Sequence, residues 1–198
     1  MITTKKELKD WLFYEKNRYG IGKNSKIRFL FGSEIATIWH FQKRLRITEY
    51  YYNSQKKIRY IVSLFRLNHL RNKYGFHIGL NVCGRGLKLM HLGPILINGD
   101  VKIGENVSIH IGTSFVAQGV NNQVPIIGNG VVVGVGAVIL GGIKIADNVA
   151  IGANAVVNKD VLEKNIAVAG IPAKKVSDNG RLKWGKTEGE ILNYRENT

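Results

Sequence analysis

Five histidines carry the side chains best suited to proton transfer near neutral pH, because an unperturbed imidazole exchanges its proton there. They are His40, His69, His77, His91 and His110. The last three are separated by 14 and 19 residues, which supplies no close pair of ligands for a metal ion. The spacing favours acid–base chemistry at a single imidazole, and no metal site is predicted.

The segments that must position such an imidazole repeat every six residues. The residues in phase are Ile97, Ile103, Ile109, Phe115, Ile127, Val133, Ile139, Ile145, Ile151 and Val157. A strand alternates with period two and an amphipathic helix repeats every 3.6 residues, so neither pattern accounts for this series. A period of six is typical of a left-handed parallel β-helix. In that fold three hexads close one triangular coil of about 18 residues around an aliphatic column.

Glycine and asparagine occupy the places where the chain would turn the corners of that prism. Most of the 23 glycines fall within residues 75–170. Asn106, Asn129, Asn148 and Asn154 are expected at corners, since asparagine and glycine tolerate left-handed backbone conformations that bulkier residues resist.

The first 74 residues predict helices instead. Thr4 and Glu7 have the spacing of a capping box, Ser33 is a candidate N-cap for a second helix, and Asn53-Ser54 is a break. The apolar residues after that break, spaced as in an amphipathic helix, are Ile58, Ile61, Val62 and Phe65. The chain is therefore predicted to be mainly β: an N-terminal α-helical cap at 1–74, a left-handed β-helix at 75–176 and a polar C-terminal tail at 177–198.

Charge is the extreme feature of the composition. The 198 residues carry a formal net charge of +15, which points to an anionic partner. Residues 41–74 hold many of the cations and one acid, Glu49. Two interpretations stay open for this segment: a solvated helical face, or a docking surface for an acidic glycan or an anionic membrane. Tyrosines lie between the cations, but no fold pattern of nucleic-acid-binding proteins accompanies them, so nucleic acid is not the expected partner.

Cysteine content and hydropathy bear on location. The lone cysteine, Cys83, excludes an internal disulfide and fits a reducing compartment. No apolar stretch follows the basic N-terminus, and no window of about 18 residues is continuously apolar. We therefore expect a cytoplasmic protein, with peripheral contact at the inner face of the membrane as one option.

Two motifs add a family resemblance to the hexads. They are GRGLKLMHLGPILIN at 84–98 and NKDVLEKNIAVAGIPAKKV at 158–176. Together with the repeat they resemble the hexapeptide-repeat acyltransferases, in particular the serine acetyltransferases and the related capsule or exopolysaccharide O-acetyltransferases. The resemblance covers about 58–176. It implies acetyl-CoA as co-substrate, a homotrimer, and a cofactor groove between neighbouring prisms.

The same resemblance assigns roles to residues. His91, in LMHLGPILI, falls where the family has its general base. Matched position by position with the related sugar acetyltransferases, the cofactor contacts are Val135, Ala153, Asn158, Lys159 and Lys174. Residue type adds others: Gly134, Gly136, Ala137, Gly152 and Ala153 would leave bare surface for the pantetheine arm, and Lys175, like Lys159 and Lys174, could meet the phosphates. Each glycine has a second interpretation as a steric need of the coil, and each lysine as ordinary surface charge. His110 is a weaker candidate, either as a contact to the acceptor or as an exposed side chain. A backbone carbonyl or Asn98 is a candidate for orienting His91.

Departures from the serine acetyltransferase pattern bear on the acceptor. Phe76 stands where that family has the Asp that orients the base, Met90 where it has an Asp beside the base, and Gln123-Val124 where it has an Arg-His pair. A free amino acid is costly to desolvate without opposite charges to meet it. The hypothesis is therefore O-acetylation of a sugar hydroxyl on a surface polysaccharide or its precursor, acidic or lipid-linked. The alternatives are L-serine O-acetylation and a non-enzymatic β-helix scaffold.

Overall fold

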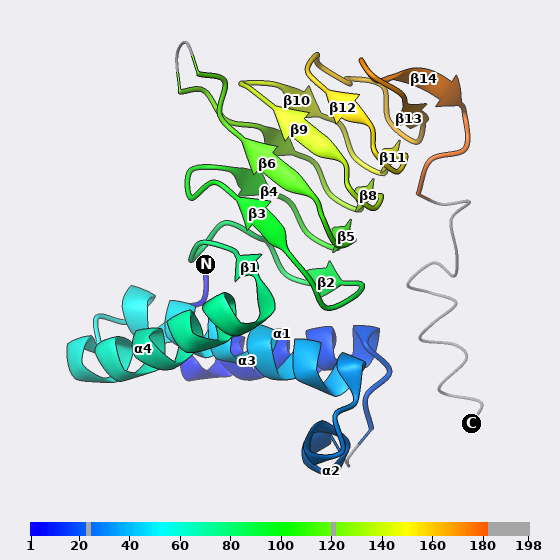
Figure 1. The fold of residues 1–198 in the computed structure, drawn as a ribbon. Coiled ribbons are helices and arrows are strands. Elements are labelled where there is room, and N and C mark those ends of the chain that lie inside the picture. Colours follow the sequence, from blue (N-terminus) through cyan, green and yellow to red (C-terminus); the bar gives the residue numbers. More distant parts are fainter. Residues whose placement is uncertain (23–24, 120–121, 182–198) are drawn as a thin grey trace.

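A computed structural model describes residues 1–22, 25–119 and 122–181. A layer of helices closes one end of a triangular β-prism, and the strands of the prism stack away from it toward the C-terminal strands (Figure 1). The helices are α1 (Lys5–Arg18), α2 (Ser25–Leu30), α3 (Glu34–Asn53) and α4 (Lys57–Tyr74). No helix among the described residues is long and apolar enough to cross a membrane.

Helix ends follow the cap chemistry in part. The predicted capping box of α1 is present: the Glu7 N–H donates to Thr4 Oγ1 at 3.1 Å, and the Thr4 N–H donates to Glu7 Oε2 at 2.9 Å. Ser33 does precede α3, but its side chain makes no cap hydrogen bond. α4 ends at Gly75, whose φ of 73° is the left-handed conformation that favours glycine.

The prism has three faces. Its strands are β1 (Phe76–His77), β2 (Lys88–Leu89), β3 (Ile95–Ile97), β4 (Lys102–Ile103), β5 (Ser108–Ile109), β6 (Ser114–Val116), β7 (Ile126–Ile127), β8 (Val132–Val133), β9 (Val138–Leu140), β10 (Lys144–Ile145), β11 (Ala150–Ile151), β12 (Val156–Val157), β13 (Ala167–Ala169) and β14 (Lys174–Ser177). The faces run β1-β3-β6-β9-β12, β4-β7-β10 and β2-β5-β8-β11-β13-β14. All named pairs are parallel except β13 with β14. The predicted left-handed β-helix with a helical N-terminus is confirmed.

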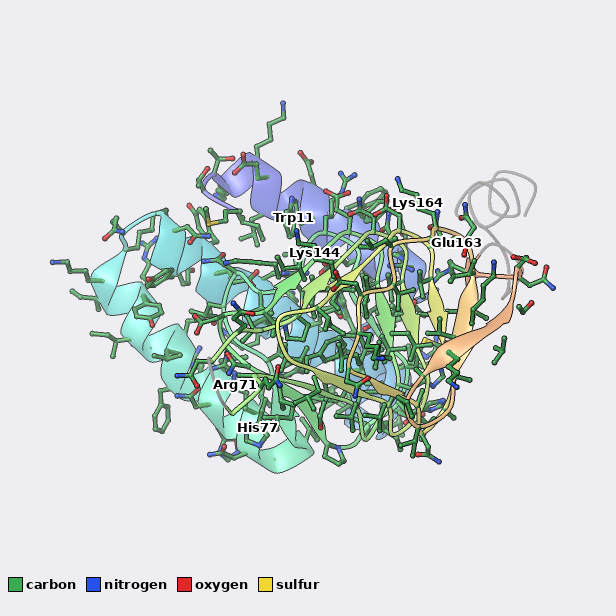
Figure 2. All side chains as sticks on the ribbon, turned by 90° about the horizontal axis from the view of Figure 1, so that it is seen from above. Trp11, Arg71, His77, Lys144, Glu163 and Lys164 are labelled. Carbon is green, nitrogen blue, oxygen red and sulfur yellow. The ribbon has the colours of Figure 1, made fainter. Side chains whose placement is uncertain are left out.

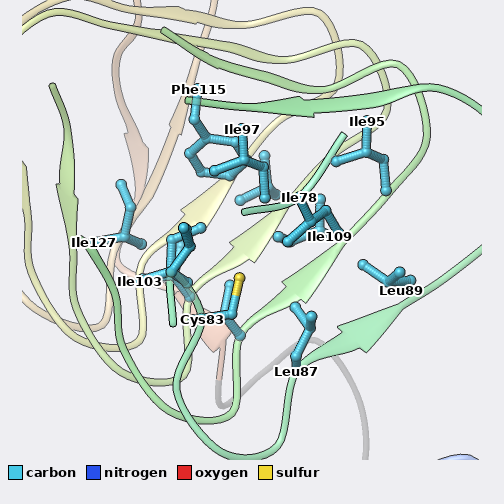
Figure 3. Packing of buried hydrophobic residues seen from close by; sticks show 14 of the residues in the cluster. Ile78, Cys83, Leu87, Leu89, Ile95, Ile97, Ile103, Ile109, Phe115 and Ile127 are labelled. Carbon is cyan, nitrogen blue, oxygen red and sulfur yellow. The ribbon is translucent and has the colours of Figure 1, made fainter. Parts of the chain in front are cut away.

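The in-phase residues form the predicted column. All ten are between 0% and 5% exposed. Figure 3 shows Ile97, Ile103, Ile109 and Phe115 converging inside the prism. One cysteine, Cys83, shares this core, and burial raises the pKa of its thiol to about 12, so it behaves as a small apolar side chain.

Three of the four predicted asparagine corners adopt the left-handed conformation. The φ angles of Asn106, Asn148 and Asn154 are 61°, 59° and 55°. Asn129 also lies in a corner turn, but there the positive φ of 65° belongs to the next residue, Gly130. Asn129 instead accepts a 2.8 Å hydrogen bond from the Glu105 N–H through Oδ1, which ties it to the preceding coil.

A buried arginine joins the helices to the prism. Arg46 of α3 contacts Glu15 of α1 at 2.7 Å and Glu49 at 2.9 Å, and donates to the carbonyls of Cys83 and Gly84 at 2.9 and 2.7 Å. Burial alone would lower the pKa of the guanidinium, but the two carboxylates outweigh it and raise that pKa. The buried guanidinium of Arg46 therefore keeps its charge and has hydrogen-bond partners for its N–H groups.

The apolar row predicted on α4 faces solvent. Ile58, Ile61, Val62 and Phe65 are 80%, 64%, 49% and 77% exposed. The opposite side of α4 packs on α3 through Leu67 and Ser63, whose hydroxyl lies 2.7 Å from that of Thr48. The domain limits stay predictions, and most of the predicted tail, residues 182–198, lies outside the described residues.

Candidate active site

His91 stands at a corner of the prism. It lies in the turn between β2 and β3, which belong to different faces, and its side chain is 54% exposed. The turn is fixed on both sides: the Met90 N–H donates to the Ile109 carbonyl at 2.9 Å, and Gly93 takes a φ of 144°. The imidazole is thus held on a rigid element and open to an incoming molecule.

A carboxylate from the helical half faces this imidazole. Oε1 of Glu34 lies 3.5 Å from Nδ1 of His91 and accepts a 2.9 Å hydrogen bond from the Leu92 N–H. A separation of 3.5 Å is an electrostatic contact rather than a full hydrogen bond. The same oxygen therefore anchors the turn and presents negative charge to the ring. This is the arrangement that orients an imidazole for proton transfer.

Glu34 is the residue that the sequence analysis missed. The sequence candidate for orienting His91, Asn98, lies past the far end of β3 and accepts instead from the Asp100 N–H, at 3.0 Å. One signal was available: between Glu15 and Asp100 the chain has only two acids, Glu34 and Glu49. Glu49 is buried against Arg46, which leaves Glu34 as the carboxylate that this stretch offers to the site.

His110 lies beside His91 rather than projecting freely outward. The two rings are 5.9 Å apart at an angle of 40°. Burial lowers the pKa of His110, and the charge of a protonated His91 lowers it further. Its Nδ1 is buried and has no hydrogen-bond partner among the described residues. A neutral second imidazole therefore stands next to the candidate base.

The register of neighbouring strands places part of the predicted cofactor site on the prism edge that carries His91. Leu89, Ile109, Val133 and Ile151 align across neighbouring strands. The residues that follow them, including His91, Val135 and Ala153, therefore share one corner of the prism. Coils stack about 4.8 Å apart, so this edge runs from His91 past Val135, two coils on, to Ala153, three coils on.

The surface of that edge is bare. Val135 is 44% exposed and Ala153 is exposed. A Cβ on Gly134 would lie 2.7 Å from the Ala153 nitrogen, and one on Gly152 would lie 2.8 Å from the Cβ of Ala169. Both glycines are needed by the coil itself. Gly134 is itself buried and Gly152 is half-buried, so the exposed part of this edge lies at Val135 and Ala153 and not at Gly134 as expected.

Other predicted cofactor residues lie elsewhere. Asn158 and Lys159 follow β12 and occupy the next edge, across the face that contains β9 and β12. Both are exposed, as is Lys174 at the start of β14. A single prism therefore does not gather the whole predicted set.

Two predicted contacts need correction. Ala137 was expected to leave bare outer surface, but it is 0% exposed and belongs to the core, so only its backbone could meet a ligand. Lys175 was expected to meet phosphate, but its Nζ lies 2.6 Å from Asp178 and 2.6 Å from Glu163. Hydrogen bonds to Asp178 and Glu163 raise the pKa of Lys175, and these two acids already offset its charge.

The remaining histidines belong to other surroundings. His77 lies on β1 near Arg71, whose guanidinium donates to the Ile78 carbonyl at the α4–β1 junction (Figure 2). His40 stacks on Phe29 with ring centroids 4.5 Å apart. Within 1–22, 25–119 and 122–181, no three His, Cys, Asp or Glu side chains gather as a metal site would require.

Comparisons with known proteins bear on the family and the fold. Residues 125–159 match the family model "Bacterial transferase hexapeptide (six repeats)". A serine acetyltransferase of Buchnera aphidicola subsp. Acyrthosiphon pisum (strain APS) is 33% identical over 150 residues, which are 74% of this chain and 53% of that protein. The chain thus spans about half the length of that curated relative.

Solved structures extend the similarity to the helical half. The serine acetyltransferase of Neisseria gonorrhoeae is 27% identical, with a TM-score of 0.70 over 96% of this chain and 72% of that one. A serine acetyltransferase of Brucella abortus strain S19 in complex with coenzyme A is 25% identical, with a TM-score of 0.66 over 87% and 67% of the two chains. The resemblance to hexapeptide-repeat acyltransferases is confirmed.

Proposed function

We propose that the protein is an acetyl-CoA-dependent O-acetyltransferase whose general base is His91. The observation that carries the proposal is the exposed imidazole held against Glu34 at the head of a bare prism edge. The similarity to serine acetyltransferases, one of them in complex with coenzyme A, supports the same reaction class. Fold alone would not, because one fold serves many functions.

The residues present fit the co-substrate. Acetyl-CoA supplies an activated thioester, and its pantetheine amides suit an edge where the side chains are small, as at the half-buried Gly152 and the exposed Ala153. Exposed cations at Lys159 and Lys174 suit the phosphates, and neither forms an ion pair among the described residues.

In this mechanism His91 moves one proton. The acceptor hydroxyl gives its proton to Nε2, the ring nitrogen turned away from Glu34, while its oxygen attacks the thioester carbonyl carbon. The carbon–sulfur bond breaks, and the same proton passes from His91 to the departing sulfur, which leaves as a thiol. Glu34 acts as a positioning residue: it holds the ring and stabilises the transient imidazolium through Nδ1.

A homotrimer would complete the cofactor site. His91 and Ala153 share one edge, whereas Asn158 and Lys159 share the next. A groove between neighbouring prisms can line a ligand with one edge from each copy. We infer that the edge of one copy carries the base and the neighbouring copy supplies the second set of contacts.

L-serine is the acceptor that the comparisons favour, since the relatives carry the name serine acetyltransferase. They support this alternative better than the sugar hypothesis from the sequence. One argument against serine was that Phe76 replaces the Asp that orients the base in serine acetyltransferases. Glu34 weakens this argument because it supplies a carboxylate beside His91, whereas the ring of Phe76 is buried and packs on Phe41, with ring centroids 4.7 Å apart.

A sugar hydroxyl is the second candidate acceptor. Met90 and Gln123-Val124 supply no charge to meet the ammonium and carboxylate of a free amino acid, and desolvating those groups unpaired is costly. The uncharged hydroxyl of a polysaccharide or its precursor has no such need.

Turnover with both acceptors tests the proposal. Release of the CoA thiol is followed with acetyl-CoA and either L-serine or an oligosaccharide fraction. We expect saturable release with L-serine and its loss in His91→Ala. His77→Ala is the matched control, because this exposed histidine lies on β1 outside the site and its removal leaves the rate unchanged. Release that depends on neither acceptor nor His91 supports the scaffold instead, and turnover on the oligosaccharide alone identifies the second acceptor.

A further inference from the structure

The outer side of α4 is an apolar row with nothing on it. Ile58, Ile61, Val62 and Phe65 fall at i, i+3, i+4 and i+7 and are each about half exposed or more, from 49% to 80%. α4 lies at the end of the molecule opposite β14, as an outer helix (Figure 1). A contiguous exposed apolar surface of this kind usually meets a partner.

Cations without acids border this row. Lys57, Arg59 and Arg66 are exposed on α4, and none forms an ion pair among the described residues. The 50 residues from Tyr50 to Gly99 contain no Asp or Glu. The positive charge of Arg66 also reaches α3: burial lowers the pKa of Arg44, and the charge of Arg66 lowers it further. The surface is therefore both apolar and positively charged.

The two basic helices differ in what remains available. On α3, Arg46 is buried and forms ion pairs with Glu15 and Glu49. On α4, the cations beside the apolar row stay in solvent. Within the basic segment 41–74, exposed cations and exposed apolar side chains thus occur together on α4, whereas Lys43 on α3 is exposed outside this face.

An anionic bilayer can meet both the apolar row and the cations of the α4 surface. An amphipathic helix with an apolar row and flanking Lys and Arg lies in the headgroup region, with its apolar side chains at the acyl boundary. An acidic glycan would meet the cations but gain little from Ile58 or Phe65. A second copy packed face to face through α4 would bring like charges together with no carboxylate between them.

We propose that the α4 face, Ile58, Ile61, Val62 and Phe65 with Lys57, Arg59 and Arg66, docks the protein on an anionic lipid bilayer. This surface is separate from the edge that carries His91, so the inference does not depend on the acetyltransfer reaction. It also accounts for a charge of +15 in a chain with no membrane-spanning helix among the described residues.

Vesicle sedimentation tests the proposal with the full chain. The vesicles are phosphatidylcholine alone, or phosphatidylcholine with phosphatidylglycerol. We expect binding to the anionic vesicles only, weakened by salt. Ile61→Ser/Phe65→Ser and Arg59→Gln/Arg66→Gln should each weaken binding about tenfold or more. The matched controls Ile126→Ser and Lys144→Gln, on exposed side chains of the prism, should bind like the original protein.

Three results would overturn the proposal, and circular dichroism establishes in each case that the variants are folded. The first is no binding to anionic vesicles at low salt. The second is a smaller particle mass for Ile61→Ser/Phe65→Ser with vesicle binding unchanged, which makes the face a contact between copies. The third is equal loss of binding in the prism controls, which makes the attraction a property of total charge. Binding to an acidic polysaccharide that needs Arg59 and Arg66 but not Phe65 identifies a glycan surface instead.

Discussion

In the prism, the core is formed by ten in-phase side chains that are each at most 5% exposed. In the helical half, by contrast, the guanidinium of Arg46 contacts three separate segments. Every coil of the prism contacts only its neighbours, so its stability is spread along the axis. Arg46 links α1, α3 and the first coil through two carboxylates and two carbonyls. The helical half has a second buried contact of this kind, in which Gln42 accepts from the Tyr19 hydroxyl at 2.7 Å and donates to the Leu87 carbonyl at 2.8 Å. Burial is therefore repeated along the prism, whereas in the helical half the polar links to the prism are concentrated in a few residues.

The candidate site combines both halves. His91 comes from a corner of the repeat, where backbone geometry fixes its place, and Glu34 comes from the start of α3. In the proposed reaction the helical cap thus supplies a carboxylate as well as closing the end of the prism. Variants that separate these contributions test the comparison.

The largest expected effect is on stability in the helical half. Arg46→Ala leaves the buried carboxylates of Glu15 and Glu49 without a cation, which should cost about 3–5 kcal/mol of the free energy of unfolding. Urea denaturation followed by circular dichroism measures it. Lys43→Ala, on an exposed position of the same helix, is the control and should change stability by less than about 0.5 kcal/mol. A loss of stability for Arg46→Ala as small as that of the control would show that the buried contacts of Arg46 do not stabilise the helical half.

A smaller effect is expected in the prism. Ile139→Val removes one buried methylene group and should cost about 0.5–1.5 kcal/mol, because neighbouring coils share the column. Ile126→Val makes the same change at a side chain that is 48% exposed and should be nearly neutral. If Ile139→Val unfolded the protein, the distributed stability of the coils would be wrong.

The smallest expected effect concerns pH. Burial holds the pKa of His110 below the ordinary value of 6.5, so the unfolded chain binds a proton more readily than the folded one. Stability from this group is present above pH 6.5 and is lost as the pH falls below it. His110→Asn should therefore lose less stability than the original protein between pH 7 and pH 5, measured by thermal melts. Parallel curves for the two proteins would exclude this contribution.

The sequence predicts the prism better than the site for a physical reason. A six-residue spacing is a local rule, because each in-phase side chain needs only its own coil and the next. Glu34 and Leu92 are 58 residues apart, and Arg46 reaches Cys83 across 37, so no local pattern reveals either contact. The row on α4 shows the same limit: spacing gives an apolar side but not which side meets the core.

Two of the expected cofactor contacts show what residue type alone cannot decide. Ala137 is small enough to leave bare surface, yet its place in the coil turns it inward. Lys175 is a cation that could meet phosphate, yet Glu163 and Asp178 already pair with it. A motif gives the residue type, whereas orientation and neighbouring charge decide what that residue can bind.

A double-mutant cycle on acetyl transfer tests most directly whether Glu34 works through His91. Glu34→Gln, His91→Asn and the double variant are compared by the rate of CoA release under saturating substrates. Glu34→Gln should lower kcat about tenfold or more with KM for acetyl-CoA unchanged, His91→Asn should lower kcat further, and the double variant should equal His91→Asn. Full activity in Glu34→Gln, or an additive loss in the double variant, would contradict the pairing of the two halves at this site.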